Sequence, residues 1–296
     1  MQHIVDTHLH IWDLEKFSLP WLDGVPALAH TVTEADYLAE CGEGPGWKLD
    51  AAIYVEVDVA ADQKLAEVAY VSARCALRES PILAAIASLD LGDRESAAML
   101  AEMAANPAIR GIRHVLHVPE SPKGACLAPA FVANVQRMGE LGLLFEACLR
   151  CEELDDLVEL AKLCPDTTII LDHMGIVDAP VIAKADPDQK ERLYRDRWLA
   201  NIAALGHLPN VACKISGIDA PRQGAMASLR PALEACFSAF GEDRILFATN
   251  YPVSQLGLGA REWIAILLGI VTGKSETFRN KLFCENALKY YRISNH

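Results

Sequence analysis

Residues 3–12 read HIVDTHLHIW, and this segment is the first of the strands from which the fold can be inferred. Its apolar residues alternate with polar ones, as in a β-strand whose successive side chains point to opposite faces. The alternation predicts that Asp6, His8 and His10 point in the same direction. Two imidazoles that converge from one rigid strand can hold a divalent metal ion. Buried histidines with purely structural hydrogen bonds also fit the pattern. The rest of the chain must distinguish a metal site from a structural role.

A repeating unit in the rest of the chain shows what this strand belongs to. From Leu49 onward, apolar segments of strand length alternate with segments of helical 3.6-residue periodicity. Further strands are predicted at 51–57, 82–89, 109–115, 143–149, 167–172, 211–216 and 244–249. Helices are predicted at 63–79, 95–105, 129–141, 151–164, 189–205, 227–240 and 260–271, with a final one at 280–291 that seals the outside. Eight strand–helix units close most economically into a (β/α)8 TIM barrel, an α/β fold, as one domain over residues 1–296.

The composition excludes several classes of partner. The net charge of −13 and the scattered Lys and Arg residues argue against nucleic acid, which requires a basic patch. Charged residues interrupt the apolar runs and the start lacks a signal-peptide pattern, so we expect no membrane span. Nine cysteines without framework spacing indicate reduced thiols, and we interpret the Cys148 and Cys151 pair as structural. We therefore expect a cytoplasmic protein that acts on a small molecule, with a monomer and a homodimer both open.

Polar residues at the ends of the predicted strands indicate where the active site lies, because TIM barrels carry their catalytic groups there. In strand 51–57 we assign the apolar residues to the helix-facing side, which directs Tyr54 and Glu56 inward. The other strand ends contribute Arg113, His114, Glu146, Cys148, Asp172, His173, Lys214, Ser216 and Asn250. Their common position favours a functional interpretation over a structural one.

The segment over residues 13–46 is too long for a plain connection, and only a short helix is expected in it, at 33–40. Loops of this length in compact domains usually carry function. Trp12 and Trp21 are therefore candidates for the wall of a substrate pocket, with packing on the barrel rim as the alternative.

Six motifs in order resemble a known family. They are DTHLHIW from Asp6, PWL from Pro20, GIR from Gly111, LDHMG from Leu171, KISG from Lys214 and RILFATNYPV from Arg244. From about residue 3 to about residue 290 the chain resembles the amidohydrolase superfamily, in the branch that contains L-fuconolactonase, L-rhamnonolactonase and 2-pyrone-4,6-dicarboxylate lactonase. The resemblance implies a TIM-barrel hydrolase of carbohydrate or aromatic catabolism. Such an enzyme opens a lactone ring and uses one divalent metal ion or none.

The resemblance also assigns roles to individual residues. The family's His-x-His falls on His8 and His10, its sixth-strand histidine on His173 and its fourth-strand arginine on Arg113. The aspartate that usually ends the eighth strand, as a metal ligand or a base, falls on Asn250. An asparagine keeps a carbonyl oxygen but cannot accept a proton, so a base role cannot be transferred to it.

A metal-dependent mechanism is one interpretation of these residues. His8, His10 and a third ligand would hold the ion, with zinc the first choice, and the third ligand would be Glu146, Glu56 or His173. A metal ion acidifies bound water and polarises the carbonyl of the substrate.

A metal-free mechanism is the other interpretation. His173 or Glu56 would be the general base, with Arg113 and the two histidines stabilising the oxyanion and Asn250 hydrogen-bonded to substrate or water. Because an ester has a better leaving group than an amide, a site without the strand-eight acid favours a lactone or ester.

Substrate-binding groups and other functions complete the expectations. Arg113, Lys214 and Arg222 are candidates for binding a carboxylate or sugar hydroxyls, and Tyr54 is a further candidate. A metal-dependent decarboxylase and a non-catalytic binding protein stay open as alternatives, and they differ from a lactonase in releasing carbon dioxide or in binding without turnover.

Overall fold

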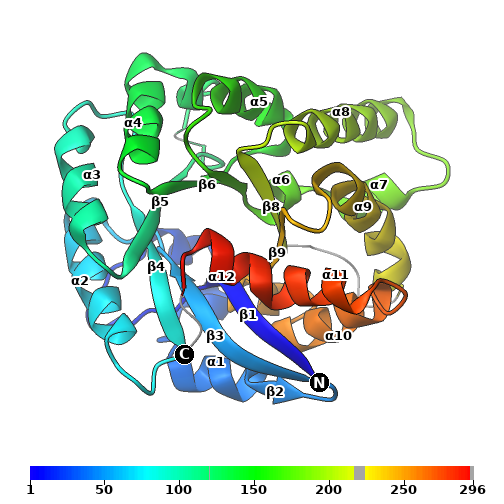
Figure 1. Ribbon diagram of the computed structural model, residues 1–296, viewed down its shortest axis with the longest axis horizontal. Coiled ribbons are helices and arrows are strands. Elements are labelled where there is room, and N and C mark those ends of the chain that lie inside the picture. Colours follow the sequence, from blue (N-terminus) through cyan, green and yellow to red (C-terminus); the bar gives the residue numbers. More distant parts are fainter. Residues whose placement is uncertain (120, 217–223, 294–296) are drawn as a thin grey trace.

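The predicted strands pair in parallel and follow one another in sequence order, β1-β3-β4-β5-β6-β7-β8-β9, as the computed structural model shows for residues 1–119, 121–216 and 224–293 (Figure 1). They are β1 Gln2–Leu9, β3 Trp47–Val55, β4 Ile82–Ser88, β5 Ile109–Val115, β6 Leu144–Cys148, β7 Ile169–Leu171, β8 Val211–Ile215 and β9 Ile245–Phe247. A short strand, β2 Glu43–Gly44, pairs antiparallel with β3. Backbone hydrogen bonds from Asn250 to His8 (3.0 Å) and from His10 to Tyr251 (2.8 Å) join the ends of β9 and β1. The predicted TIM barrel is confirmed.

Helices surround this ring of strands (Figure 1). They are α1 Glu34–Cys41, α2 Lys64–Cys75, α3 Ser96–Ala105, α4 Pro129–Glu140, α5 Leu154–Leu163, α6 His173–Ile176, α7 Ala179–Ala183, α8 Gln189–Gly206, α9 Ala225–Phe240 and α10 Ala260–Ile270. The start of α8 follows from its sequence. Asp188 accepts a hydrogen bond from the backbone of Glu191, whose side chain accepts one from Asp188 in return, so two free N–H groups of the first turn are satisfied.

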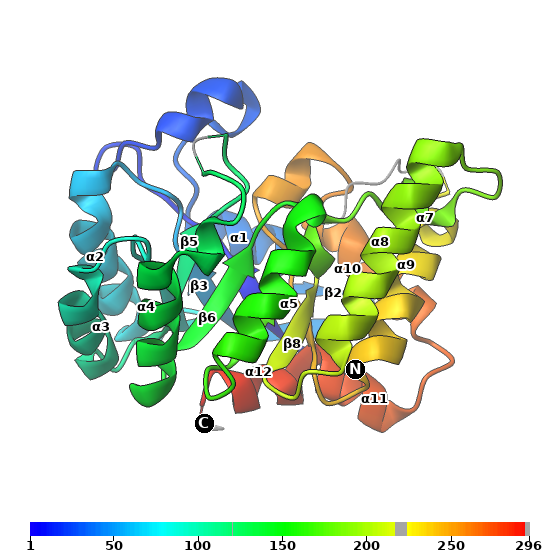
Figure 2. The same ribbon diagram turned by 90° about the horizontal axis from the view of Figure 1, so that it is seen from above.

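The C-terminal helical segments cover one end of the barrel rather than its outer wall. They are α11 Glu276–Asn280, a π-helical segment Lys281–Glu285 and α12 Asn286–Tyr290. Figure 2 shows α11 and α12 at the end opposite to the dark blue segment that contains the 3-10 helix η1 Pro20–Gly24. This arrangement allows Tyr291, which is fully buried, to pack inside the barrel with residues of β3, β4, β6, β7, β8 and β9.

The side chains of β3 point the opposite way from the prediction. Ile53 and Val55 pack in the barrel interior, whereas the Tyr54 hydroxyl donates to Glu67 of α2 over 2.7 Å. Tyr54 therefore lies between the barrel and its helices and does not face the interior. Both faces of a barrel strand are apolar, so the alternation of residue types carried no information about which face is inside.

The long segment after β1 holds η1, a second 3-10 helix η2 Pro26–Leu28, and α1. The indole N–H of Trp21 donates to the Val57 carbonyl (2.8 Å), and the indole N–H of Trp12 donates to the His30 carbonyl (2.6 Å). The two rings meet edge to face at 5.7 Å. The segment is thereby fixed over the ends of the strands.

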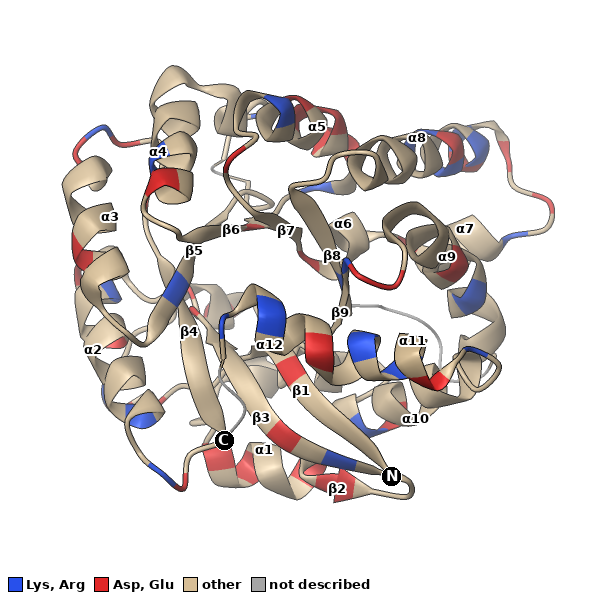
Figure 3. Cartoon of the chain, in the orientation of Figure 1, with Lys and Arg blue, Asp and Glu red and all other residues tan. Residues whose placement is uncertain are grey.

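Surface features bear on the expected partners. Figure 3 shows acidic and basic residues interspersed along outer helices such as α5 and α8. Within the described residues, no helix combines the length and the apolar character needed to cross a membrane. The nine cysteines are free thiols.

Candidate active site

A cavity of about 360 Å³ lies at the C-terminal ends of the barrel strands. Its volume falls within the range of small-molecule pockets, and its place is that of the active site in TIM-barrel enzymes. It is lined by His10, Trp21, Val57, Asp58, Arg113, Val115, His117, Val118, Cys148, His173, Ile176, Asn250 and Val253.

The end of β1 directs its polar side chains to two different sides. The register of β1 against β3 shifts beyond Asp6, so strict alternation is interrupted there. Asp6 accepts hydrogen bonds from the Tyr37 hydroxyl (2.8 Å) and the Thr249 backbone N–H (2.9 Å), whereas His8 and His10 meet inside the barrel. The expectation that Asp6 points with the two histidines is wrong. Its carboxylate ties the ends of two strands to α1.

The hydrogen bonds of His10 assign its tautomer, whereas His8 lies among several polar groups. His10 Nδ1 lies 2.8 Å from the Val55 carbonyl, which can only accept, so this nitrogen carries the proton. In a neutral ring His10 Nε2 is then an acceptor, and it lies 3.1 Å from His8 Nε2. His8 Nδ1 lies 3.1 Å from the Lys214 ammonium and 3.6 Å from Asp172 Oδ1. Burial, followed by nearby cations, lowers the pKa of His10 to about 3 and that of His8 well below its usual value, so both rings are neutral.

A fully buried layer of charges lies beside His8. The Lys214 Nζ atom lies 2.6 Å from Glu146 Oε2 and 3.1 Å from Asp172 Oδ1. The Tyr291 hydroxyl donates to the other oxygen of Glu146 over 2.6 Å. Burial raises the pKa of Glu146 to about 7 despite the charge of Lys214. For Asp172, Lys214 and His8 outweigh burial and hold the pKa well below its usual value. The layer therefore places an ionised Asp172 next to the cavity residue His173.

Arg113 connects the charged layer to the cavity. Its Nε donates to Glu56 Oε1 (2.5 Å) and its Nη2 to the Glu56 carbonyl (2.7 Å). Its Nη1 lies 3.3 Å from His8 Nε2 and 3.9 Å from Asp172 Oδ2. Glu56 is fully buried and does not line the cavity. Glu56 thus orients Arg113, and only part of the guanidinium is left for a substrate.

His173 reaches the cavity from an unusual backbone turn. Residues His173, Met174, Gly175 and Ile176 all have positive φ values, between 50° and 75°, which form a left-handed turn. Non-glycine residues rarely adopt this conformation, and runs of them cluster at functional sites. His173 Nδ1 is held by the Ser216 hydroxyl at 2.9 Å. Burial lowers the pKa of His173 to about 4, against the attraction of Asp172, so the ring is neutral at physiological pH.

Asn250 follows β9 and lies beside the same cavity. Its φ of 58° is left-handed, a conformation that Asn tolerates better than most residues. Its backbone N–H is bound to the His8 carbonyl, which fixes the position of the residue. Asn250, which stands where the resembled family usually has an aspartate, therefore lies in the cavity wall.

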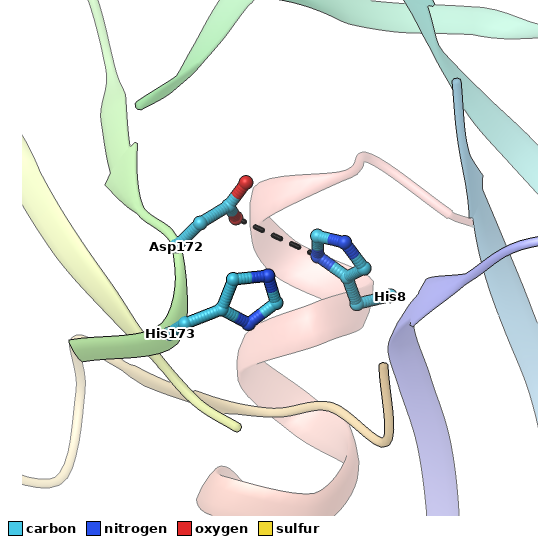
Figure 4. A group of neighbouring side chains, drawn as sticks. All are labelled: His8, Asp172 and His173. Carbon is cyan, nitrogen blue, oxygen red and sulfur yellow. Dashed lines mark ion pairs between the residues drawn. The ribbon is translucent and has the colours of Figure 1, made fainter. Parts of the chain in front are cut away.

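One group of side chains fits a divalent metal ion. The ligand atoms of His8, Asp172 and His173 lie within 4.8 Å of one another (Figure 4). Both carboxylate oxygens of Asp172 are buried, with Lys214 and Arg113 as their charged neighbours, and two imidazoles with a carboxylate are a zinc donor set. The ammonium of Lys214 lies 3.1 Å from both Asp172 Oδ1 and His8 Nδ1, so an ion here would share its ligands with that cation.

The candidates from the sequence divide into three groups. His10, Arg113, His173, Asn250 and Trp21 share the cavity. Glu56, Lys214, His8 and Glu146 lie behind it, and both oxygens of Glu146 are occupied by Lys214 and Tyr291, which does not favour a metal ligand there. Trp12 and Tyr54 lie outside its wall, and Arg222 lies outside the described residues.

Three residues near the cavity were not assigned a catalytic or binding role of their own from the sequence. Asp172 precedes His173 at the end of a strand, and that adjacent pair was the available signal. His117 and Cys148 approach each other across the cavity wall, with Sγ 3.4 Å from Nδ1. Residues of two different strand ends form this contact, so spacing along the chain could not indicate it.

Comparisons with known proteins agree with this architecture. A crystal structure of an amidohydrolase from Burkholderia multivorans with bound zinc superposes with a TM-score of 0.80 at 22% identity, over 99% of this chain and 100% of that one. L-fucono-1,5-lactonase of B. multivorans (strain ATCC 17616 / 249) is 27% identical over 262 residues, 85% of this chain and 83% of that protein. The uncharacterized protein y4mH of Sinorhizobium fredii (strain NBRC 101917 / NGR234) is 29% identical over 313 residues, 98% of each chain. A family model described as amidohydrolase matches residues 5–293, and the chain therefore belongs to the amidohydrolase family.

Proposed function

We propose that the protein hydrolyses a lactone, opening the ring with an activated water to give a hydroxy acid. The observation that carries this proposal is the convergence of a neutral imidazole, His173, with Arg113 and Asn250 on one cavity at the strand ends. The lactonase name of a relative that covers most of the chain supports it. General base catalysis requires an unprotonated group within reach of the water, and His173 meets the first condition across the neutral pH range.

The residues divide the reaction between them. His173 takes a proton from water as the water oxygen bonds to the lactone carbonyl carbon. The guanidinium of Arg113, oriented by Glu56, donates to the carbonyl oxygen as negative charge develops there. When the ring C–O bond breaks, the protonated His173 returns the proton to the departing alkoxide. Asn250 hydrogen-bonds to the water or substrate, a role for which an amide suffices.

A bound metal ion would give His173 a different role, because its Nδ1 is held by Ser216 and its other nitrogen cannot bind an ion and accept a proton at the same time. We propose that His8, Asp172 and His173 are able to hold one divalent ion, with zinc the first choice, and the zinc-containing structure of the same fold supports this. When bound, the ion would supply an acidified water and a Lewis acid for the carbonyl. Lys214 would then tune the charge of Asp172 and His8 through its contacts at 3.1 Å.

The test is a pH-indicator screen of the purified protein over a panel of lactones, together with measurement of its metal content. Acid release with stoichiometric appearance of the hydroxy acid supports the proposal. Release of carbon dioxide from aromatic acids would show a decarboxylase instead. Ligand binding without turnover, in both metal-loaded and chelator-treated protein, would show a binding protein.

A further inference from the structure

The wall of the cavity is mainly apolar away from the catalytic groups. Its aliphatic and sulfur-containing side chains are Val57, Val115, Val118, Cys148, Ile176 and Val253, and the Trp21 ring adds an aromatic face. They come from the last residues of β5 and β6 and from segments after β3, β5, β7 and β9, so apolar surface is presented from several directions. A substrate that fills the cavity must place much of its surface against these groups.

Several polar groups of the cavity use hydrogen-bonding positions on neighbouring protein groups. Arg113 spends its Nε and Nη2 on Glu56, and His10 Nδ1 is bound to the Val55 carbonyl. His173 Nδ1 is held by Ser216. The carbonyl and ring oxygen of a lactone would use the remaining groups, among them Arg113 Nη1 and the Asn250 amide. Each additional hydroxyl buried against methyl groups without a partner weakens binding by about tenfold or more.

The charges around the cavity also disfavour an anionic substrate. Among the lining residues that the structure describes, Arg113 is the one Lys or Arg side chain, and Glu56 is paired with it. Asp172 lies 3.9 Å from the same guanidinium. A substrate carboxylate would meet a cation that already has two carboxylate neighbours.

We propose that the cavity selects an uncharged monocyclic lactone whose ring carries an aliphatic or aromatic substituent, in preference to a polyhydroxylated or carboxylate-bearing lactone. The volume of about 360 Å³ is near the lower end for small-molecule pockets, which suits one ring with a short substituent. This inference rests on the proposed lactone hydrolysis for its reaction, but the selection itself is a property of binding. It would separate this chain from the relative named L-fucono-1,5-lactonase.

The test uses lactams, whose amide resists hydrolysis, so that binding is measured apart from turnover. The probes are δ-valerolactam, its 6-methyl, 6-ethyl and 6-propyl derivatives, the 6-carboxy derivative and D-glucono-δ-lactam, with Kd from isothermal titration calorimetry. The Kd should fall about fourfold for each added methylene, the value for burial of one such group. The glucono and carboxy lactams should bind at least tenfold more weakly than the propyl lactam. Equal Kd values across the alkyl series, or tighter binding of either polar lactam than of the propyl lactam, would overturn the proposed selection.

Isosteric variants test whether the cavity wall causes the preference for alkyl-substituted lactams. Val118→Thr and Val253→Thr replace a methyl group of the wall by a hydroxyl, and each should weaken the propyl lactam by about fivefold while leaving unsubstituted δ-valerolactam within twofold. Val132→Thr is the matched control, because Val132 packs on α4 outside the cavity wall. Equal effects of all three variants would contradict the assignment, with circular dichroism showing that each is folded.

The two proposals fail in different ways. If the lactam series behaves as expected but no lactone is opened, the selection stands and the proposed hydrolysis is wrong. If glucono-δ-lactone is opened and its lactam binds most tightly, hydrolysis stands and the selection is wrong.

Discussion

His173 is the residue from which the proposed chemistry follows most directly. His173→Asn retains a side-chain amide near Ser216 but removes the proton acceptor, so we expect kcat to fall at least about a hundredfold with little change in fold. The measurement is steady-state kinetics on an accepted lactone. His207→Asn, an exposed histidine after α8, is the control and should leave kcat unchanged. Turnover of His173→Asn close to wild type would remove His173 from the mechanism.

Asn250→Asp tests whether the strand-eight group must be a base. We expect no gain in kcat/KM, because the cavity already contains a proton acceptor and the new carboxylate would lie near the electron-rich carbonyl of the substrate. Tighter metal retention is the expected side effect, since a carboxylate is a better ligand than an amide. Kinetics and metal content measured on the same preparation check both. A large increase in lactone hydrolysis would show that the native site lacks a needed base.

The buried histidines make stability depend on pH. The pKa of His173 is lowered from 6.5 to about 4, so below pH 6.5 the unfolded chain binds a proton that the folded chain does not. Stability is therefore lost as the pH falls from about 6.5 towards about 4, and His173 accounts for about 2 kcal/mol of this loss between about pH 6.5 and pH 5. In chelator-treated protein, urea titrations should show a loss about 2 kcal/mol smaller in His173→Asn than in wild type. An equal loss in both would contradict a neutral buried His173.

At the scale of elements, the left-handed turn of α6 carries the functional group. Gly175→Ala places a Cβ at φ 75° and 2.8 Å from Leu154 side-chain atoms, so we expect a loss of about 1–2 kcal/mol in the free energy of unfolding. The turn also positions His173, so kcat should fall as well. The matched control is Gly24→Ala in η1, where a Cβ meets nothing within 4 Å and φ is not positive. Denaturant unfolding of both variants decides whether the turn is strained as described.

The strands and helices show how far a sequence carries the fold. The order of strands and helices was predictable because helical and extended periodicities alternate along the chain. The direction in which the Tyr54 side chain points was not predictable, because β3 is apolar on both sides. The direction of the Asp6 side chain was not predictable either, because the register shift in β1 depends on the pairing of β1 with β3.

The site shows the same division. His173, Arg113 and Asn250 were predictable as polar residues at strand ends, a place that the barrel reserves for chemistry. The ion pair of Arg113 with Glu56 was not predictable, since the two residues come from different strand ends and each of them could have faced a substrate instead. The shared contact of Asp172 and Glu146 with Lys214 likewise depends on three strands meeting inside the barrel, which no local pattern encodes.

At the scale of the whole molecule, the C-terminal segment and the charged layer stabilise each other. Tyr291→Phe removes the donor to Glu146 and leaves a buried carboxylate oxygen without a partner, so we expect a loss of about 1–3 kcal/mol in stability. Tyr290→Phe, at a partly buried position next to it, should change stability by less than about 0.5 kcal/mol. Thermal or urea unfolding of the two variants is the measurement. Equal stability of both would show that the contact inside the barrel is not stabilising.

The place of Tyr291 in the chain also bears on synthesis. A ribosome releases the chain from its N-terminus, so β1 with His8 emerges first and Tyr291 emerges after every strand of the barrel. Until then Lys214 and Glu146 face an end of the barrel that α11 and α12 do not yet cover. A nascent chain can therefore contain all its strands while the charged barrel interior is still exposed to water. In this state, chaperones and proteases can bind before the C-terminal helices cover the barrel.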